Sequence, residues 1–405
     1  MEPLARTDAV LADGLARKEP VAVTAAQGKL AVKVLGSLAE IASHEADWRM
    51  LEAATPTPCL FQSFDWCMNF ARHAAERNEE TFEVFVVSRD GQPVAILPLA
   101  IRMNQGIRVL TGMSEPFQQY TDMLVSRSVS PRAAFKAMLP VMRSRGADYL
   151  HFGQVRADSV LAQAIEGTVP VSGEKDAAPY VQLSDWPSFE DYQKSINAKT
   201  RKNMRNARNR LERDAPVSHE VAHEGAGLAG VIDRSFEGRE AWLERQGLTS
   251  RAFRDTGFGE FVARFKDQAQ SGVDTVAFSL RHGDKPIADQ WGFIHKGRYY
   301  AFMAGWDNAL EESSPGKMHL GCILEACHAE GLDCADFMIP AARYKFTWAR
   351  EATPVHDHVM PLTLRGTIHN RVWLDFLRPL AKKLAYAIPP KLRAWLFRLL
   401  LPASN

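Results

Sequence analysis

The segment VAFSLRHGDKPIADQWGFIHKGRYYAFMAGWD, residues 276–307, decides the fold. Apolar residues alternate in it with small or polar ones, and Gly283-Asp284 and Lys296-Gly297 interrupt the alternation. A period of two indicates a strand, and a glycine at the break favours a tight turn. The segment therefore predicts an antiparallel meander of three strands joined by two short turns.

The next segment, SSPGKMHLGCILEACHAEGLDCADFMIP (residues 313–340), predicts a helix and then a short strand over residues 334–339. Pro315 and Gly316 are typical of a helix start, and Gly331 is typical of a helix end. A strand that leads into such a start leaves free backbone N–H groups and the positive end of the helix dipole at one point, which suits a phosphate. The alternative is an ordinary helix start without a ligand. We predict that the phosphates of a donor bind at five consecutive residues: Ser314, Pro315, Gly316, Lys317 and Met318.

This order of strands, loop, helix and strand, followed by ARYKFTW (residues 342–348), resembles the acyl-CoA-dependent N-acyltransferases of the GNAT superfamily. It resembles in particular the CelD/BcsL branch, named for cellulose biosynthesis, and more distantly the peptidoglycan FemAB transferases. The matching residues are Trp306-Asp307, Ser314-Pro315-Gly316, Asp336-Phe337, Tyr344-Lys345 and Trp348. The resemblance spans about residues 61–362 and implies acetyl-CoA or another acyl-CoA as cosubstrate, with no bound cofactor. The segment Ser-Pro-Gly-Lys-Met has one glycine where standard GNAT enzymes have a glycine-rich pyrophosphate loop, which leaves room for another activated acyl donor.

A weak internal repeat indicates two copies of one architecture. FVVSRDGQPVA (residues 85–95) and FSLRHGDKPIA (residues 278–288) share the order strand, charged turn with glycine, Pro, apolar residue, Ala. We therefore predict an α/β (α+β) fold of tandem GNAT-like domains, each a mixed, mostly antiparallel sheet flanked by helices, with C-terminal amphipathic helices. The predicted division is a disordered leader over 1–30, an N-terminal GNAT-like domain over 31–180, a C-terminal acyltransferase domain over 181–365 and a basic tail over 366–405. Coincidence is the alternative explanation of so divergent a repeat.

The composition is that of a soluble globular protein with no global bias toward nucleic acid. The 405 residues are 46% hydrophobic and 24% charged, with a net charge of +1. The five cysteines include no CxxC pair, which argues against a disulfide scaffold or a zinc site and favours a reducing compartment. No run of 18 apolar residues is present, and the leader lacks the apolar core of a signal peptide. We expect a cytoplasmic protein.

A basic stretch lies between the two copies. Residues 194–213 hold eight basic residues and one acid, Glu212, and we predict one basic helix there. Arg201, Arg205 and Arg208 share a helical face, so we assign them to an anionic substrate group. The alternative is a solvated linking helix. Nucleic acid is not expected as a partner, since no base-reading side chain accompanies these arginines.

The tail from residue 371 combines seven basic residues and one acid with many apolar side chains. Such segments bind anionic bilayer interfaces, so we predict peripheral association with the inner membrane through residues 371–405. The alternative is a C-terminal helix docked on the protein body.

Acyl transfer needs a base, a proton donor for the leaving thiolate, and donors aimed at the oxyanion. The resemblance implies an electrostatic role for Lys345, and Tyr344 is a candidate general acid. Candidate bases are His319 and Asp307. The alternatives are that His319 only packs in the interior and that Asp307 only stabilises the turn after its strand. Tyr344, too, can be an ordinary core tyrosine.

The acceptor side draws on the first copy. The resemblance places the loop with Gln119, Tyr120 and Asp122 against the acceptor, and Gln290 lies on the central strand of the second copy. No G-x-S-x-G or H-E-x-x-H motif is present, so we expect no metal and direct attack of the acceptor on a thioester.

The function expected from these features is transfer of an acyl group, preferably acetyl, to nitrogen or oxygen of an envelope polysaccharide or lipid-linked sugar precursor at the cytoplasmic membrane face. One alternative is long-chain acyl transfer to the amine of a sphingoid base, which makes a ceramide-type lipid. Aminoacyl transfer from tRNA is a further enzymatic alternative. A GNAT-fold scaffold that senses an anionic ligand is the non-catalytic one.

Overall fold

The computed structural model describes residues 29–57, 59–104, 106–248 and 250–371. Its strands are β1 (Leu30–Leu35), β2 (Phe82–Arg89), β3 (Gln92–Asn104), β4 (Ile107–Gly112), β5 (Leu124–Val125), β6 (Tyr149–Arg156), β7 (Val171–Gln182), β8 (Val217–Ala222), β9 (Thr275–His282), β10 (Lys285–His295), β11 (Arg298–Trp306), β12 (Cys334–Asp336) and β13 (Glu351–Pro361). They form one mixed sheet in the order β1-β2-β3-β4-β6-β13-β7-β12-β11-β10-β9-β8, and β5 pairs with β3.

Helices cover both faces of this sheet. They are α1 (Leu38–Ser43), α2 (Glu45–Ala54), α3 (Phe64–Glu76), α4 (Pro131–Ser144), α5 (Val160–Ile165), α6 (Phe189–Ser195), α7 (Ala198–Leu211), α8 (Gly225–Gln246), α9 (Arg251–Arg254), α10 (Phe258–Ala263), α11 (Gln268–Ser271), α12 (Pro315–Ala329) and α13 (Leu364–His369). Short 3-10 turns are η1 (Leu60–Gln62), η2 (Leu183–Asp185), η3 (Arg264–Lys266), η4 (Asn308–Ser313) and η5 (Lys345–Thr347). No helix in the described ranges is both long and apolar enough to cross a membrane.

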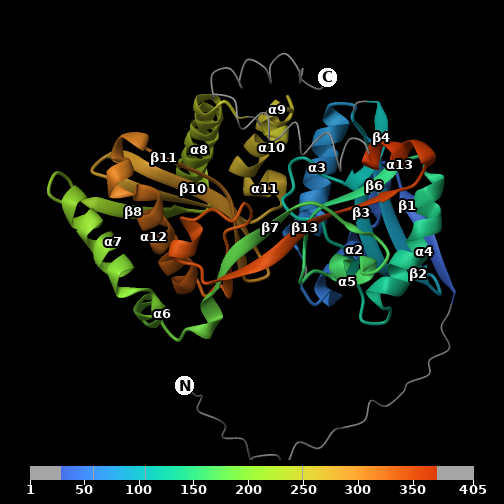
Figure 1. Cartoon of the computed structure of the whole chain (residues 1–405), viewed down its shortest axis with the longest axis horizontal. Helices are drawn as coiled ribbons and strands as arrows, with labels where there is room; N and C mark the ends of the chain where they lie inside the picture. Colours follow the sequence, from blue (N-terminus) through green and yellow to red (C-terminus); the bar gives the residue numbers. More distant parts are fainter. Residues whose placement is uncertain (1–28, 58, 105, 249, 372–405) are drawn as a thin grey trace, which may run out of the picture.

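The two copies predicted from the repeat are present. Hairpin β2–β3 turns at Asp90-Gly91, hairpin β9–β10 turns at Gly283-Asp284, and Gly283 has a φ of +58° that suits glycine. Each hairpin is followed by a third strand, a helix and a parallel strand, namely β4–α4–β6 and β11–α12–β12. In Figure 1 the first copy lies on the right and the second on the left. The predicted fold class is therefore confirmed.

Two strands cross between the copies. Strand β13, which follows the second copy in the sequence, lies between β6 and β7, and β7 also pairs with β12. Figure 1 shows β7 and β13 running side by side across the middle of the molecule. Tyr180 pairs with both Glu351 and Asp336, so the sheet continues unbroken through the predicted boundary at residue 180. The division into domains stays a prediction.

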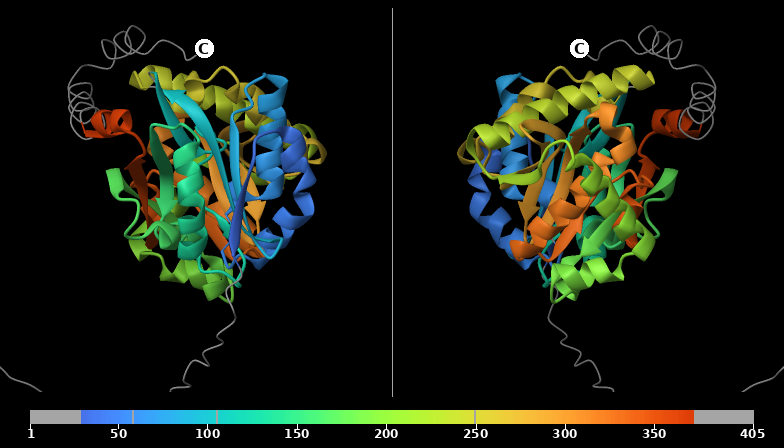
Figure 2. Two further views of the ribbon diagram at one scale, coloured as in Figure 1. Left: turned by 90° about the vertical axis from the view of Figure 1, so that its right-hand side faces the viewer. Right: turned by 90° about the vertical axis from the view of Figure 1, so that its left-hand side faces the viewer.

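A shared aromatic core joins the two halves. Trp66 of α3 stacks on Phe265 with ring centroids 5.4 Å apart and meets Phe293 of β10 edge-on at the same distance. Phe61 approaches Tyr300 of β11 at 6.1 Å. Separate apolar clusters lie under α4 and α5 on the first half and under α12 on the second. Figure 2 shows the molecule from its two ends, and in both views the strands lie between layers of helices. Because one cluster draws on both halves, they pack as one body.

Two predicted element bounds are wrong. Residues 194–213 form two helices, because the side chain of Asn197 accepts the Lys199 backbone N–H and begins α7 anew. The strand predicted over 334–339 ends at Asp336, since Met338 has a φ of +58° and its backbone N–H bonds the Asp336 carboxylate at 2.8 Å. Residues 1–28 of the predicted leader and 372–405 of the predicted tail lie outside the described residues.

Candidate functional site

Strands β11 and β12 stay together for only a short distance. They pair from Arg298 with Cys334 to Tyr300 with Asp336, and β11 then continues to Trp306 paired with β10 but no longer with β12. A Cβ added at Gly316, in the first turn of α12, would lie 3.7 Å from the Trp306 indole, and the Tyr344 ring lies 6.4 Å from it. Trp306 thus sits between the two segments predicted to bound the donor site.

Trp348 fastens the second of these segments to α12. Its Nε1–H donates to the Lys317 carbonyl at 2.7 Å. A Cβ at Gly321 would lie 2.5 Å from the Trp348 ring, so only glycine leaves room for the indole at this point of α12. The structure therefore brings Ser314–Met318 and Tyr344-Lys345 together, while the roles assigned to them stay predictions.

Lys345 is buried and braces the chain after β12. Its Nζ donates to the carbonyl of Met338 at 2.8 Å and to that of Pro340 at 2.9 Å, which leaves one of its three N–H groups free for another acceptor. Desolvation lowers the pKa of Lys345 to about 8, against an opposing effect of Asp336. Burial raises the pKa of Tyr344, so its hydroxyl keeps its proton at neutral pH and can donate it.

The two candidate bases of the second copy, His319 and Asp307, have surroundings that explain them without a catalytic role. His319 is 2% exposed, its ring faces His219 at 5.4 Å, and its Nε2 has no hydrogen-bond partner in the part of the chain that the structure describes. Burial lowers the pKa of His319 well below its usual value. Asp307 holds Lys285 at 2.6 Å and the Ala309 backbone N–H at 2.9 Å, and these bonds lower its pKa. A carboxylate held in this way is a weak base.

Gln290 lies in the interior of the second copy rather than facing the first one. It is buried, and its Nε2 donates to the Tyr299 hydroxyl at 3.1 Å. Tyr299 belongs to the apolar cluster under α12. The structure therefore does not bring Gln290 to the other residues assigned to the acceptor.

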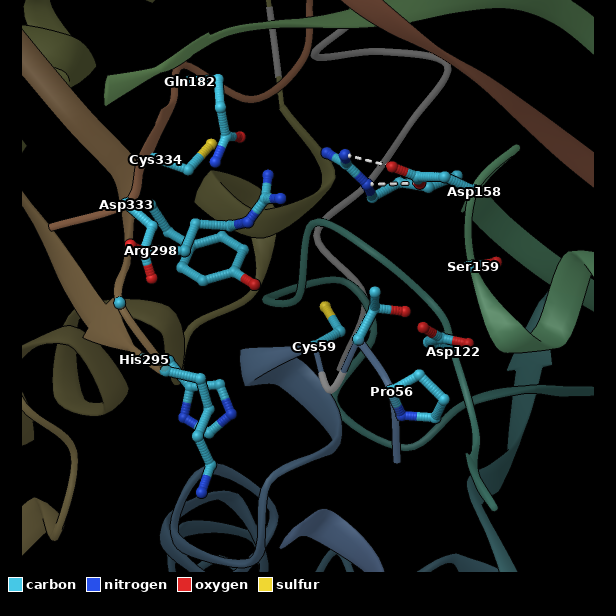
Figure 3. A pocket seen from close by; sticks show the side chains of 15 residues that line it. Pro56, Cys59, Asp122, Asp158, Ser159, Gln182, His295, Arg298, Asp333 and Cys334 are labelled. Carbon is cyan, nitrogen blue, oxygen red and sulfur yellow. Dashed lines mark hydrogen bonds and ion pairs between the residues drawn. The ribbon is translucent and has the colours of Figure 1, made fainter. Parts of the chain in front are cut away.

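A cavity of about 410 Å³ lies where the two halves meet (Figure 3). The first half contributes Pro56, Thr57, Cys59, Asp122, Arg156, Asp158 and Ser159 to its lining. The second contributes Gln182, His295, Lys296, Gly297, Arg298, Tyr300, Asp333 and Cys334. Apart from Asp122, none of these was predicted, because they come from separate segments that only the folded sheet brings together.

The buried carboxylate of Asp336 ties the cavity walls together. Arg156 from the first half donates to it at 2.6 Å and Arg298 from the second at 3.2 Å. The hydroxyl of Tyr120 donates to its other oxygen at 3.2 Å. Tyr120, predicted to face the acceptor, is thus buried behind the cavity wall.

Charged side chains of both signs line both walls of the cavity. The first half contributes Asp122, Asp158 and Arg156, and the second contributes Arg298, Lys296 and Asp333. Figure 3 shows Asp122 and Asp158 across the cavity from Arg298 and Asp333. One oxygen of Asp122 accepts the backbone N–H groups of Met123 and Leu161, each at 2.8 Å, and burial raises its pKa to about 7. A carboxyl group with such a pKa can exchange a proton near neutrality.

The corresponding position in the first copy is filled by its own loop. Strands β4 and β6 pair only at Val109–Tyr149 and Leu110–Leu150, after which residues 113–123 run on as a mostly buried segment. A Cβ at Gly112 would strike Gln118, and a Cβ at Gly153 of β6 would lie 2.6 Å from Glu115. Side chains of this loop thus lie against both parting strands. The first copy is therefore a poor candidate for the donor site.

The arginines assigned to an anionic group have different surroundings. Arg201 donates to the carbonyls of residues 193, 194 and 196, and Arg208 donates to Glu212 and to the Val217 carbonyl. Arg205 is exposed. Gln119 is half-buried and its Oε1 has no hydrogen-bond partner among the described residues. No group of three or more His, Cys, Asp or Glu side chains within the described ranges is arranged to hold a metal ion.

Residues 198–346 match the sequence model of the acetyltransferase (GNAT) domain. Over the fold, the chain is similar to the crystal structure of FemX, with 11% identity, 82% of this chain and 98% of that chain covered, and a TM-score of 0.52. It is also similar to the C-terminal DUF2156 domain of a putative lysylphosphatidylglycerol synthetase from Agrobacterium fabrum, with 14% identity, coverage of 80% and 92%, and a TM-score of 0.49. A tandem GNAT protein from the clavulanic acid biosynthesis pathway gives 12% identity, coverage of 83% and 99%, and a TM-score of 0.49.

No curated protein matches the sequence. The prediction of a GNAT-type acyltransferase is confirmed by the matching domain. The CelD/BcsL branch stays a prediction.

Proposed function

We propose that this GNAT-type acyltransferase works through its second copy and moves an acyl group from acetyl-CoA, or another acyl-CoA, to an amine or hydroxyl held in the cavity between the halves. One observation carries the proposal. Cys334 lines the cavity, and the carbonyl of Met338, four residues later, accepts from Lys345, whose neighbour Tyr344 lies 6.4 Å from Trp306. The segment after β12 therefore connects the donor side with the acceptor side.

The donor would bind with its phosphates at Ser314–Met318 and its thioester where β11 and β12 part. The acceptor atom attacks the thioester carbon, a C–N or C–O bond forms, and the C–S bond breaks. The leaving thiolate takes a proton from the Tyr344 hydroxyl, and the free N–H of Lys345 faces the developing oxyanion. This assignment keeps the predicted roles of both residues.

Asp122 is the base we favour for the proton of the acceptor. It lines the cavity, and its pKa of about 7 lets it be ionised when the acceptor binds and protonated afterwards. His319 and Asp307 are weaker choices, because one is sealed in the interior and the other is held in an ion pair.

Two acceptor classes are supported by different observations. The polar cavity, whose two walls both carry carboxylates and cations, favours a sugar or amino-sugar group of an envelope polysaccharide or lipid-linked precursor. Beside the donor side, Trp306 is 40% and Phe346 is 44% exposed, and such apolar surface favours a lipid chain. Long-chain acyl transfer to a sphingoid-base amine is therefore the second candidate. For either acceptor we propose a cytoplasmic protein held at the inner membrane through residues 371–405.

Calorimetric titration with acetyl-CoA and with palmitoyl-CoA tests the proposal. Binding of a thioester, followed by thiol release on addition of an amino sugar or of sphinganine, supports transfer and identifies the acceptor class. If the folded protein binds neither thioester, the enzyme proposal fails and a non-catalytic sensor of an anionic ligand replaces it. Removal of residues 372–405 should shift the protein from sedimenting with vesicles to remaining in solution, and unchanged sedimentation contradicts the membrane assignment.

A further inference from the structure

Helix α7 and the turn after it carry a cationic surface that the fold does not use. Five of its side chains are exposed and have no ion-pair partner among the described residues: Lys199, Lys202, Arg205, Arg210 and Arg213. Two acids accompany them: Glu212 is engaged by Arg208 at 2.8 Å, and the exposed Asp214 follows Arg213 in the turn. An excess of positive charge over the acids beside it attracts an anionic ligand.

The C-terminal half of α7 lies beside the predicted donor loop. Ala207 and Leu211 are buried in one cluster with Met318, which belongs to the first turn of α12, and Leu310 of η4 packs against the same cluster. These contacts place the cations near residue 211 next to the helix start assigned to the donor phosphates. Lys317, in that first turn, adds another cation.

Two other polyanions fit this surface less well. No large hydrophobic residue of α7 is exposed, so the helix lacks the side chains that insert into a bilayer interface. It also lies at the opposite end of the long axis of the molecule from α13, after which the basic tail begins (Figure 1). Residues 198–214 themselves contain no aromatic side chain, although stacking on successive nucleic-acid bases requires several.

We propose that Arg205, Arg210 and Arg213 bind the 3′-phosphate of the coenzyme A donor, an inference that rests on the proposed function. Coenzyme A carries this phosphate monoester on the ribose next to its pyrophosphate. With Gly316 as the one glycine among residues 314–318, the backbone grip on the pyrophosphate is incomplete, and a cationic helix at its side supplies the missing attraction. The interaction is between exposed charges, so it weakens as salt rises.

The test compares coenzyme A with dephospho-coenzyme A, which lacks only the 3′-phosphate, by calorimetric titration of the full chain. We expect the wild type to bind coenzyme A about tenfold more tightly at low salt, which is a typical size for an exposed charge-assisted contact. The variant R205Q/R210Q/R213Q should bind both ligands with the affinity that the wild type has for dephospho-coenzyme A. The matched control, R127Q/K136Q/R143Q, removes three exposed cations near α4 of the first copy and should keep the tenfold preference.

Equal binding of the two ligands to the wild type overturns the inference while leaving the proposed function intact. Failure of the wild type to bind either ligand removes the proposed function itself. Loss of binding to phosphatidylglycerol vesicles in the α7 variant, with its preference for coenzyme A unchanged, assigns the surface to a membrane and also overturns the inference. A circular dichroism spectrum of each variant confirms that these surface changes leave the fold intact.

Discussion

Replacing Asp336 by Ala should cost more stability than any other single change at the junction of the halves. Its side chain is fully buried and accepts hydrogen bonds from Tyr120, Arg156, Arg298 and the Met338 backbone. Without it, Nη1 of Arg156 loses its buried carboxylate, although Nε and Nη2 keep Asp158; the Arg156 side chain is only 9% exposed. Removal of one partner from a buried ion pair typically costs about 3–5 kcal/mol.

Urea unfolding followed by far-UV circular dichroism measures this cost. Asp158→Ala is the matched control, because it removes the other carboxylate from Arg156 at a position that is 53% exposed. Exposed ion pairs contribute about 0–1 kcal/mol, so the control should unfold nearly as the wild type does. If D336A and D158A differ by less than about 1 kcal/mol, a bound water or solvent reaches Arg156 and the reasoning about its burial is wrong.

Three further predictions concern the site. Because burial lowers the pKa of Lys345 from 10.5 to about 8, the unfolded chain binds more protons than the folded one between these pH values. The stability of the wild type relative to Lys345→Met should therefore rise by up to about 3 kcal/mol between pH 8 and 10.5. Urea unfolding at both pH values measures this rise, and a constant difference contradicts it. Asp122 has a raised pKa of about 7, so the rate of acyl transfer should increase as the pH rises through 7. Asp122→Asn should lower kcat at least a hundredfold and abolish this pH dependence. If the variant keeps the wild-type pH profile, Asp122 is not the base. Gly321→Ala places a methyl group 2.5 Å from the Trp348 ring, so it should lower the free energy of unfolding by about 1–3 kcal/mol and weaken acyl-CoA binding. The control Gly238→Ala meets no atom within 4 Å and should be neutral or stabilising. Equal titration curves and unfolding midpoints for the two variants would falsify the proposal that Trp348 holds residues 344–348 against α12.

Local signals were sufficient for the hairpins and for the start of α12. Gly283 and Pro315 act within their own turns, so their effect is visible in a few consecutive residues. The position of Gly321 inside a predicted helix also carries information about packing. A glycine inside a helix costs about 1 kcal/mol relative to alanine, and its presence within α12 suggests close packing by another side chain, which Trp348 supplies.

The cavity and its charged network were beyond such signals. Arg156 and Asp336 are 180 residues apart in the sequence, and their contact depends on β13 and β7 lying between β6 and β12. Charge spacing on α7 predicted a shared face for Arg201, Arg205 and Arg208, and their role in binding an anion stays a prediction. The spacing did not show that the break at Asn197 turns three carbonyl groups toward Arg201 and removes that side chain from the cationic surface.

The exchange of strands between the copies decides how this protein can be divided. A fragment that ends near residue 182 retains β6 and β7 but loses β13, so both strands would expose unpaired backbone edges to solvent and to other molecules. The second copy expressed alone would in turn lack β7, the neighbour of β12. Chimeras and truncations should therefore keep residues 30–361 together, and a new pair of chain ends belongs in an exposed hairpin turn such as the one at Asp90-Gly91.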